Sequence, residues 1–269
     1  MSSTNLPSFE RPPVVETVLG VQFSEIPGFS NAHLGAFWRS LGDDWPRVED
    51  APPIEPAYER FSGESAWGVQ PKFTLTNNPA TRVRIKNRAD DTMVQLQNGR
   101  LHLNWLGQGG AEYPRYKAVR PEFDRISTLF RVFLLEQGLG EPQPNQWEIT
   151  YVNHIPKGSI WAQPEDLIKV LVGLPGAWKP LSNVRFEGFG GAWHYEIEPQ
   201  RGRLHVNASL VSLGSEEIKE AMRLTLTARG PASDKSSLGE GLDLGRKAIV
   251  TTFKEITSAD AHSYWGLAQ

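Results

Sequence analysis

The alternation of hydrophobic and polar residues along the chain predicts short strands and a few amphipathic helices. Between residues 15 and 23, every second side chain suits the buried face of a strand that is covered on one side. From Asn31 onward, hydrophobic residues recur three and four positions apart, so we expect a helix there with Ser30 or Asn31 as its N-cap. Residues 46–56 are rich in proline and cannot form a helix or a central strand.

The rest of the chain predicts two groups of strands, each followed by a helix. In the first group we expect strands at residues 67–76, 81–88, 93–97 and 100–106, and then a helix that begins at Pro121 and ends at Gly138. The second group is predicted as a strand over 147–155, a short helix over 164–174, strands near 184–189, 191–197, 203–212 and 221–228, and a long helix from about Leu238. Asn98-Gly99 predicts a type I′ hairpin turn, and Ser258 is expected to cap a final helical turn.

A short internal match suggests that the chain repeats one unit. The segment Gly99-Arg100-Leu101-His102-Leu103-Asn104 recurs as Gly202-Arg203-Leu204-His205-Val206-Asn207. Because the flanking elements agree in order, we predict an α+β fold of two tandem β-α-β-β-β-β-α repeats, over 14–140 and 141–269, after an N-terminal extension over 1–13. Each antiparallel sheet would carry its helices on one face. The repeats could join edge to edge, in a TATA-binding-protein-like arrangement, or pack face to face.

Polar side chains gather on the sheet face that the helices are expected to leave open. The candidate binding residues on that face are Arg82, Arg84, Gln95, Gln97, Arg100, His102, Asn104, Arg203, His205, Asn207 and Arg223. The two-residue turn predicts that Gln95 lies opposite His102. Guanidinium and amide groups suit phosphate, base edges or peptide backbone, although a solvated sheet face shows the same alternation.

Composition narrows the classes of function. The chain has 28 Lys and Arg against 31 Asp and Glu, a net charge of -3, so no overall positive field attracts nucleic acid or a membrane surface. It contains no cysteine, which excludes disulfides and cysteine-ligated metals. There is no signal peptide and no apolar run near the roughly 20 residues of a membrane span, so we expect a cytoplasmic location.

The sequence gives no catalytic motif, metal ligand set or cofactor motif that we would assign. His194, Glu196 and Glu198 alternate on one strand but would need further ligands from elsewhere to hold a metal. The glycines between 239 and 245 resemble a phosphate-binding loop only superficially, because they lie inside a helical pattern. His102 and His205 could act as an acid–base pair only if the fold brought them within hydrogen-bond distance.

Several segments resemble one bacterial family over nearly the whole length of the chain. They are Pro12-Pro13-Val14-Val15-Glu16 with Val18-Leu19-Gly20-Val21-Gln22-Phe23, and Tyr151-Val152-Asn153-His154-Ile155. This sequence is similar to a sporadically distributed family of uncharacterised bacterial proteins with the same N-terminal and central motifs. The resemblance implies a bacterial cytoplasmic protein whose gene lies on patchily inherited genetic elements. Phage-defence and toxin–antitoxin genes are found in the same setting. The resemblance assigns no site residues to this chain.

Taken together, these patterns predict a non-catalytic binding or adaptor protein. It would recognise a protein or nucleic-acid partner through the polar sheet face and would not bind a membrane. The sequence does not decide whether it forms a homodimer. Two alternatives remain at this point: an enzyme acting on a nucleotide or nucleic acid, and a small-molecule sensor that uses the aromatic-rich space between sheet and helices.

Overall fold

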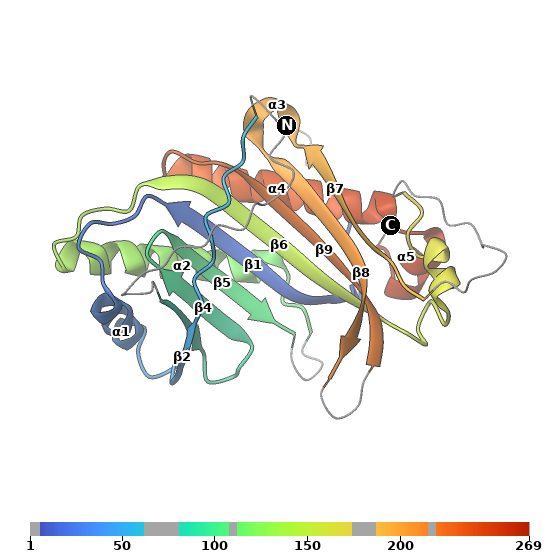
Figure 1. Ribbon diagram of the computed structural model, residues 1–269, viewed down its shortest axis with the longest axis horizontal. Coiled ribbons are helices and arrows are strands. Elements are labelled where there is room, and N and C mark those ends of the chain that lie inside the picture. Colours follow the sequence, from blue (N-terminus) through green and yellow to red (C-terminus); the bar gives the residue numbers. More distant parts are fainter. Residues whose placement is uncertain (1–5, 62–80, 108–111, 174–186, 215–218, 269) are drawn as a thin grey trace.

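The chain folds around one antiparallel sheet, seen from its helix-free side in Figure 1. The computed structural model describes residues 6–61, 81–107, 112–173, 187–214 and 219–268. These residues form a nine-stranded sheet in the order β2-β3-β4-β5-β1-β6-β9-β8-β7. The fold is therefore α+β, as predicted, and the two halves of the chain join edge to edge through β1 and β6.

The elements follow the chain in two successive sets. The first set is β1 (Val14–Phe23), α1 (Asn31–Ser40), β2 (Arg47–Ala51), β3 (Arg82–Lys86), β4 (Thr92–Gln97), β5 (Arg100–Leu106) and α2 (Tyr116–Glu136). The second set is β6 (Pro144–Pro156), the 3-10 helix η2 (Pro164–Lys169), β7 (Gly190–Glu196), the irregular turn α3 (Glu198–Arg201), β8 (Arg203–Leu213), β9 (Lys219–Pro231), α4 (Lys235–Ile256) and α5 (Ala259–Trp265).

The long helices α2 and α4 cover one face of the sheet and leave the other face free of helices (Figure 1). Helix α4 lies against β6 and β9, and its glycines make this contact possible. A Cβ on Gly241 would stand 2.2 Å from the ring of Trp147, which is 1% exposed, and one on Gly245 would stand 2.6 Å from the same ring. These glycines therefore serve helix–sheet packing, which explains why they lie inside a helical pattern.

Most predicted elements are present, and the differences have local causes. Helix α2 begins at Tyr116 and not at Pro121, because Tyr116 and Val119 are buried and extend the packed face, while exposed Pro121 lies in its second turn. The Asn98-Gly99 hairpin is present with Gln97 paired to Arg100, but only Gly99 has positive φ, so the turn is not type I′. The Asn98 amide instead bonds the backbone of Ile26.

Two predicted strands fall wholly or partly outside the described residues. The strand expected over 67–76 lies outside them altogether. The first half of the strand expected over 184–189 also lies outside them, and residues 187–189 are not in a strand. The Pro-rich region contains one strand, β2, which holds no proline and lies at the edge of the sheet, so the prediction that this region forms no helix and no central strand is confirmed.

The repeated Gly-Arg-Leu-His motif does not mark equivalent places in the two halves. His102 lies on β5, next to the central strand β1, whereas His205 lies on β8, which β9 separates from the central strand β6. The repeated segment therefore lies on non-equivalent strands and does not support the predicted duplication. A tandem repeat of the whole unit is not shown by this arrangement.

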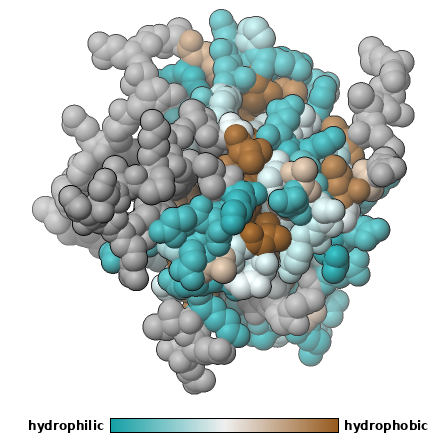
Figure 2. All heavy atoms as spheres, turned by 90° about the vertical axis from the view of Figure 1, so that its right-hand side faces the viewer, coloured by the Kyte–Doolittle hydropathy of each residue, from teal (hydrophilic) through white to brown (hydrophobic). Residues whose placement is uncertain are grey.

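On the face shown in Figure 2, hydrophobic residues form small groups separated by hydrophilic ones. Small apolar groups of this kind are normal on the surface of a globular domain. Within the described ranges, no helix is long and apolar enough to cross a membrane.

Candidate functional site

The chain itself crosses the helix-free face on which the candidate binding residues lie. Residues 52–61, which follow β2, run over the sheet from its β3–β4 side toward β8 (Figure 1). The alternative of a solvated sheet face does not hold for most of these candidates. Six of them are at least nine-tenths buried, namely Gln95, Gln97, Arg100, His102, Asn104 and His205.

A row of polar side chains in register across four strands lies beneath this segment. The row consists of Gln97 on β4, Arg100 on β5, Gln22 on β1 and Gln146 on β6, each paired with the next. With strands about 4.8 Å apart, the row is about 14 Å long. The five residue steps from Ile54 to Glu59 cover about 16 Å in extended conformation, so an extended chain matches the row in length.

The two terminal glutamines of this row bind the backbone of the segment. The Gln97 amide accepts from the N–H of Ile54 at 2.8 Å and donates to its carbonyl at 2.9 Å. The Gln146 amide accepts from the N–H of Glu59 at 3.0 Å and donates to the carbonyl of Ala57. Both contacts recognise peptide backbone and place no condition on the side chains of the bound segment.

Two arginines add contacts to backbone carbonyls. Arg82 donates to the carbonyl of Pro52 at 3.0 Å, and Arg100 donates to that of Glu55 at 3.3 Å and to the side chain of Gln22 at 2.6 Å. Burial lowers the pKa of both guanidinium groups, with a further contribution from neighbouring arginines. These cations are therefore already engaged within the fold.

Glu59 fixes the far end of the segment. Its carboxylate, 6% exposed, lies 2.7 Å from Arg203, 2.6 Å from His205 Nε2 and 3.1 Å from Arg229. Burial alone would raise the pKa of Glu59, but the hydrogen bond and charge of His205, with Arg229 and Arg203, outweigh it and lower the pKa. The site therefore favours an ionised carboxylate.

Residues around Glu59 extend this anchor. His205 Nδ1 lies 2.8 Å from His194 Nδ1, and Arg203 also donates to the carbonyl of Arg60 and stacks on the ring of Phe61 at 5.1 Å. Burial and then the neighbouring His205 and Arg203 lower the pKa of His194. Arg203 and His205 therefore contact the end of the segment at Glu59, Arg60 and Phe61.

A second chain of side-chain hydrogen bonds lies toward the β3 side of the sheet. Arg82 donates to Gln95, Gln95 donates to Asn104 at 2.9 Å, and Asn104 donates to Glu16 at 2.6 Å. The predicted pairing of Gln95 with His102 is confirmed by the strand register. Cross-strand bonds of this kind hold the polar side chains of the face in fixed positions.

His102 lies over Gly20 on the neighbouring strand. A Cβ on Gly20 would stand 2.5 Å from the imidazole, and the ring reaches to 3.7 Å from the carboxylate of Glu148. Burial lowers the pKa of His102 to about 4, although the charge of Glu148 opposes this shift. The imidazole is therefore neutral at pH 7, and its contact with Glu148 is not an ion pair there.

The remaining candidates lie apart from the segment. Arg84 pairs with Glu49 at 2.9 Å on the surface, and Arg223 is exposed and donates to His154 at 3.2 Å. Asn207 is exposed. The structure therefore brings Arg82, Gln97, Arg100, Arg203 and His205 onto one bound segment and leaves these three outside it.

The two histidines of the repeated motif are too far apart for joint chemistry. Three strands separate β5 from β8, which places them four strand spacings, about 19 Å, apart. An acid–base pair of His102 and His205 is thereby excluded. Among the described residues no group of three or more His, Asp or Glu is placed to hold a metal ion.

Sequence reasoning missed several residues of this site. Gln22 and Glu148 occupy polar positions of strands that alternation predicted, so the same pattern could have found them. Glu59 lies in a segment without periodicity and carries no such signal.

Comparisons with protein-family models, curated proteins and solved structures give no match to this chain.

Proposed function

We propose that this chain is a non-catalytic binding protein that recognises an extended segment of a protein partner on its helix-free sheet face. Residues 52–61 of the same chain occupy that face. The observation that carries the proposal is the pair of two-point contacts from Gln97 and Gln146 to the backbone of this segment. Side-chain amides that bind backbone in this way bind any extended chain of suitable length.

The segment has the properties of an exchangeable occupant. It contains no regular secondary structure, and none of the described hydrophobic-core residues comes from it. Of its two large aromatic side chains, Tyr58 is 54% exposed and Phe61 is only partly buried. Segments held mainly by polar contacts, with little apolar burial, open locally at low free-energy cost, so a partner can compete for the same groups.

The chemistry of the face defines the partner. The partner segment would be extended, would tolerate proline because carbonyls accept most of the contacts, and would present a carboxylate where Glu59 binds. A nucleic-acid partner is less well supported, because Arg82, Arg100 and Arg203 are bonded within the fold. The cytoplasmic, phage-defence or toxin–antitoxin setting rests on the family resemblance and is part of the proposal.

The test uses a labelled peptide with the sequence of residues 51–61 and the variant Glu59→Gln. In the wild-type chain, the cis segment competes at an effective concentration in the millimolar range, so binding of the added peptide should be weak. Loss of the carboxylate should free the face, and fluorescence anisotropy should show tighter peptide binding by Glu59→Gln. Glu55→Gln is the matched control, because Glu55 is exposed and only its carbonyl contacts the sheet.

Two further measurements make the result specific. Adding Gln146→Ala to Glu59→Gln should weaken peptide binding again, because the peptide loses its two-point backbone contact. Salt-sensitive binding of single-stranded DNA, with no peptide binding, would instead favour the nucleic-acid alternative. A folded Glu59→Gln chain that does not bind the peptide would refute the proposal.

A further inference from the structure

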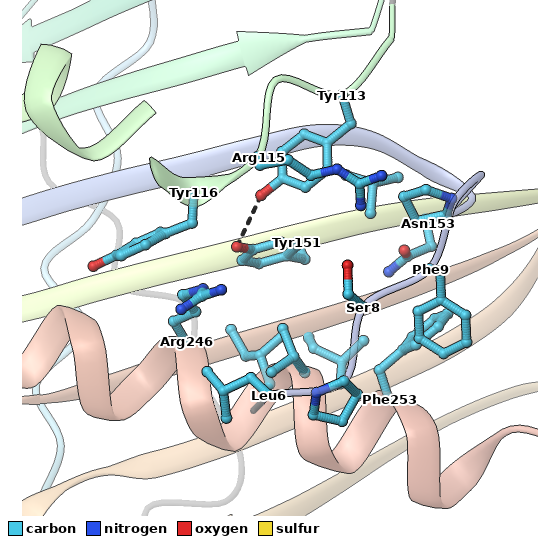
Figure 3. Close-up of a pocket in the computed structure, with 16 residues that line it drawn as sticks. Leu6, Ser8, Phe9, Tyr113, Arg115, Tyr116, Tyr151, Asn153, Arg246 and Phe253 are labelled. Atoms are coloured by element: carbon cyan, nitrogen blue, oxygen red, sulfur yellow. Dashed lines mark hydrogen bonds between the residues drawn. The ribbon is translucent and has the colours of Figure 1, made fainter. Parts of the chain in front are cut away.

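A cavity lies on the opposite face of the sheet, under the N-terminal segment and beside α4 (Figure 3). Its volume is about 100 Å³, somewhat smaller than the ~150 Å³ cavity that holds benzene in an engineered lysozyme. Five parts of the chain converge on it: residues 6–14, the start of α2 with the residues before it, strands β6 and β9, and helix α4. None of the candidate residues of the helix-free face lines it, so it is a separate site.

Two arginines give the cavity a positive charge. Arg115 and Arg246 line it, and the lining contains no aspartate or glutamate. Their guanidinium groups stack on tyrosine rings, Arg115 on Tyr113 at 5.7 Å and Arg246 on Tyr116 at 4.8 Å. In the described part of the chain neither arginine forms an ion pair, although the protein as a whole has a net charge of -3. Two such cations in one small cavity favour an anion.

A pair of tyrosine hydroxyls provides a hydrogen-bond donor beside these cations. The hydroxyls of Tyr113 and Tyr151 lie 2.9 Å apart, and Tyr151 is 5% exposed (Figure 3). Burial raises the pKa of both phenols, so both stay protonated at neutral pH. Two hydroxyls that share one hydrogen bond use one proton between them, and the other proton remains to be donated to an acceptor.

The other side of the cavity is apolar. Leu6, Phe9, Ile249 and Phe253 line it, and Phe9 packs edge-on against Phe253 at 5.4 Å. In Figure 3 the aromatic rings of Phe9 and Phe253 lie away from the Tyr113–Tyr151 pair. The cavity therefore has a cationic, hydrogen-bonding end and a hydrophobic end, the arrangement that suits a ligand of two parts.

We propose that this cavity binds a small organic carboxylate with a short apolar body. The carboxylate would lie between the guanidinium groups of Arg115 and Arg246 and accept from the tyrosine pair, and the apolar body would contact Phe9 and Phe253. The volume limits that body to about the size of a four-carbon chain. The proposal does not depend on the function assigned to the helix-free face.

Calorimetric titration with butyrate tests this site. Butyramide has the same shape without the charge, and inorganic phosphate has the charge without the apolar body. We expect saturable binding of butyrate in the micromolar to low millimolar range and binding of butyramide that is at least about tenfold weaker. Arg246→Met keeps a long side chain over Tyr116 and removes the charge, and should weaken butyrate binding about tenfold or more.

The control variant is Lys247→Met, which removes an equal charge from the adjacent exposed position of α4 and should leave butyrate binding unchanged. Tyr151→Phe removes one hydroxyl and should weaken binding severalfold, with circular dichroism confirming that each variant is folded. Several results would overturn the proposal: no saturable binding at about 10 mM butyrate, equal binding of butyramide, equal binding of phosphate, or equal loss in Lys247→Met.

Discussion

Acidification should destabilise the protein through one buried histidine, His102. The imidazole is 5% exposed, lies over Gly20, and has Arg100 and Arg82 nearby. Burial lowers its pKa from 6.5 to about 4, so the folded state holds it neutral over a pH range in which the unfolded chain protonates it. The perturbation that isolates this effect is His102→Gln, which keeps a polar side chain and removes the titration.

The sign and size follow from proton binding in the two states. Between pH 6.5 and about pH 4 the unfolded state binds a proton at His102 that the folded state does not bind, so the free energy of unfolding falls as pH falls. A shift of this size removes about 2 kcal/mol between about pH 7.5 and about pH 5. Below pH 4 both states are protonated, and the contribution no longer changes.

The assay is urea denaturation of the wild type and of His102→Gln at about pH 7.5 and about pH 5. Other histidines with lowered pKa values, His154 among them, titrate in both proteins and cancel in the comparison. We expect His102→Gln to lose about 2 kcal/mol less stability than the wild type over this interval. An equal loss in both proteins, or an NMR titration that places the pKa of His102 near 6.5 in the folded state, would refute the reasoning.

Two packing predictions follow from the glycines. Gly20→Ala should cost about 1–3 kcal/mol in urea denaturation, because its Cβ would meet His102 at 2.5 Å, and it should cost less when His102 is also changed to Ala, which removes the clash. Gly241→Ala should destabilise the protein by a similar amount, although alanine favours helices, because its Cβ would meet Trp147 at 2.2 Å. The control is Gly35→Ala in α1, which has open space around it and should stabilise the protein by about 0.5–1 kcal/mol. A neutral Gly241→Ala would show that α4 can move away from Trp147.

Local patterns predicted the elements well because they depend on neighbouring residues. Alternation located β1, β4 and β5, and the cap at Ser258 is present, with its hydroxyl accepting from the N–H of Ala261. The start of α2 was misplaced because Pro121 satisfies a helix start in isolation, while burial of Tyr116 extends the helix beyond it. How the halves join was left open, because the pairing of β1 with β6 connects residues more than a hundred positions apart.

Alternation also predicted part of the candidate site. It identified several polar residues, including Gln97, Arg100 and His205, that contact residues 52–61. It could not show that residues 52–61 lie on that face, because backbone contacts such as that of Gln97 with Ile54 leave no mark in the sequence of the covering segment. Alternation could not decide between a solvated face and a covered one, since the same amides that bond water can bond a peptide.

The way in which residues 52–61 lie on the sheet bears on what they are for. A segment that serves only to complete a fold generally buries apolar side chains, because hydrophobic burial is the main source of stability. This segment places its backbone against Gln97 and Gln146, leaves Tyr58 largely exposed, and buries a carboxylate at Glu59. A peptide bound in a polar groove makes contacts of this kind, with backbone bonds along its length and one charged anchor.

That resemblance favours an exchangeable occupant over a fixed cover, and the exchange rates of the Ile54 and Glu59 amide protons distinguish the two. An exchangeable segment exposes these amides at a free-energy cost well below that of global unfolding, whereas a fixed cover protects them as strongly as the amides of β1.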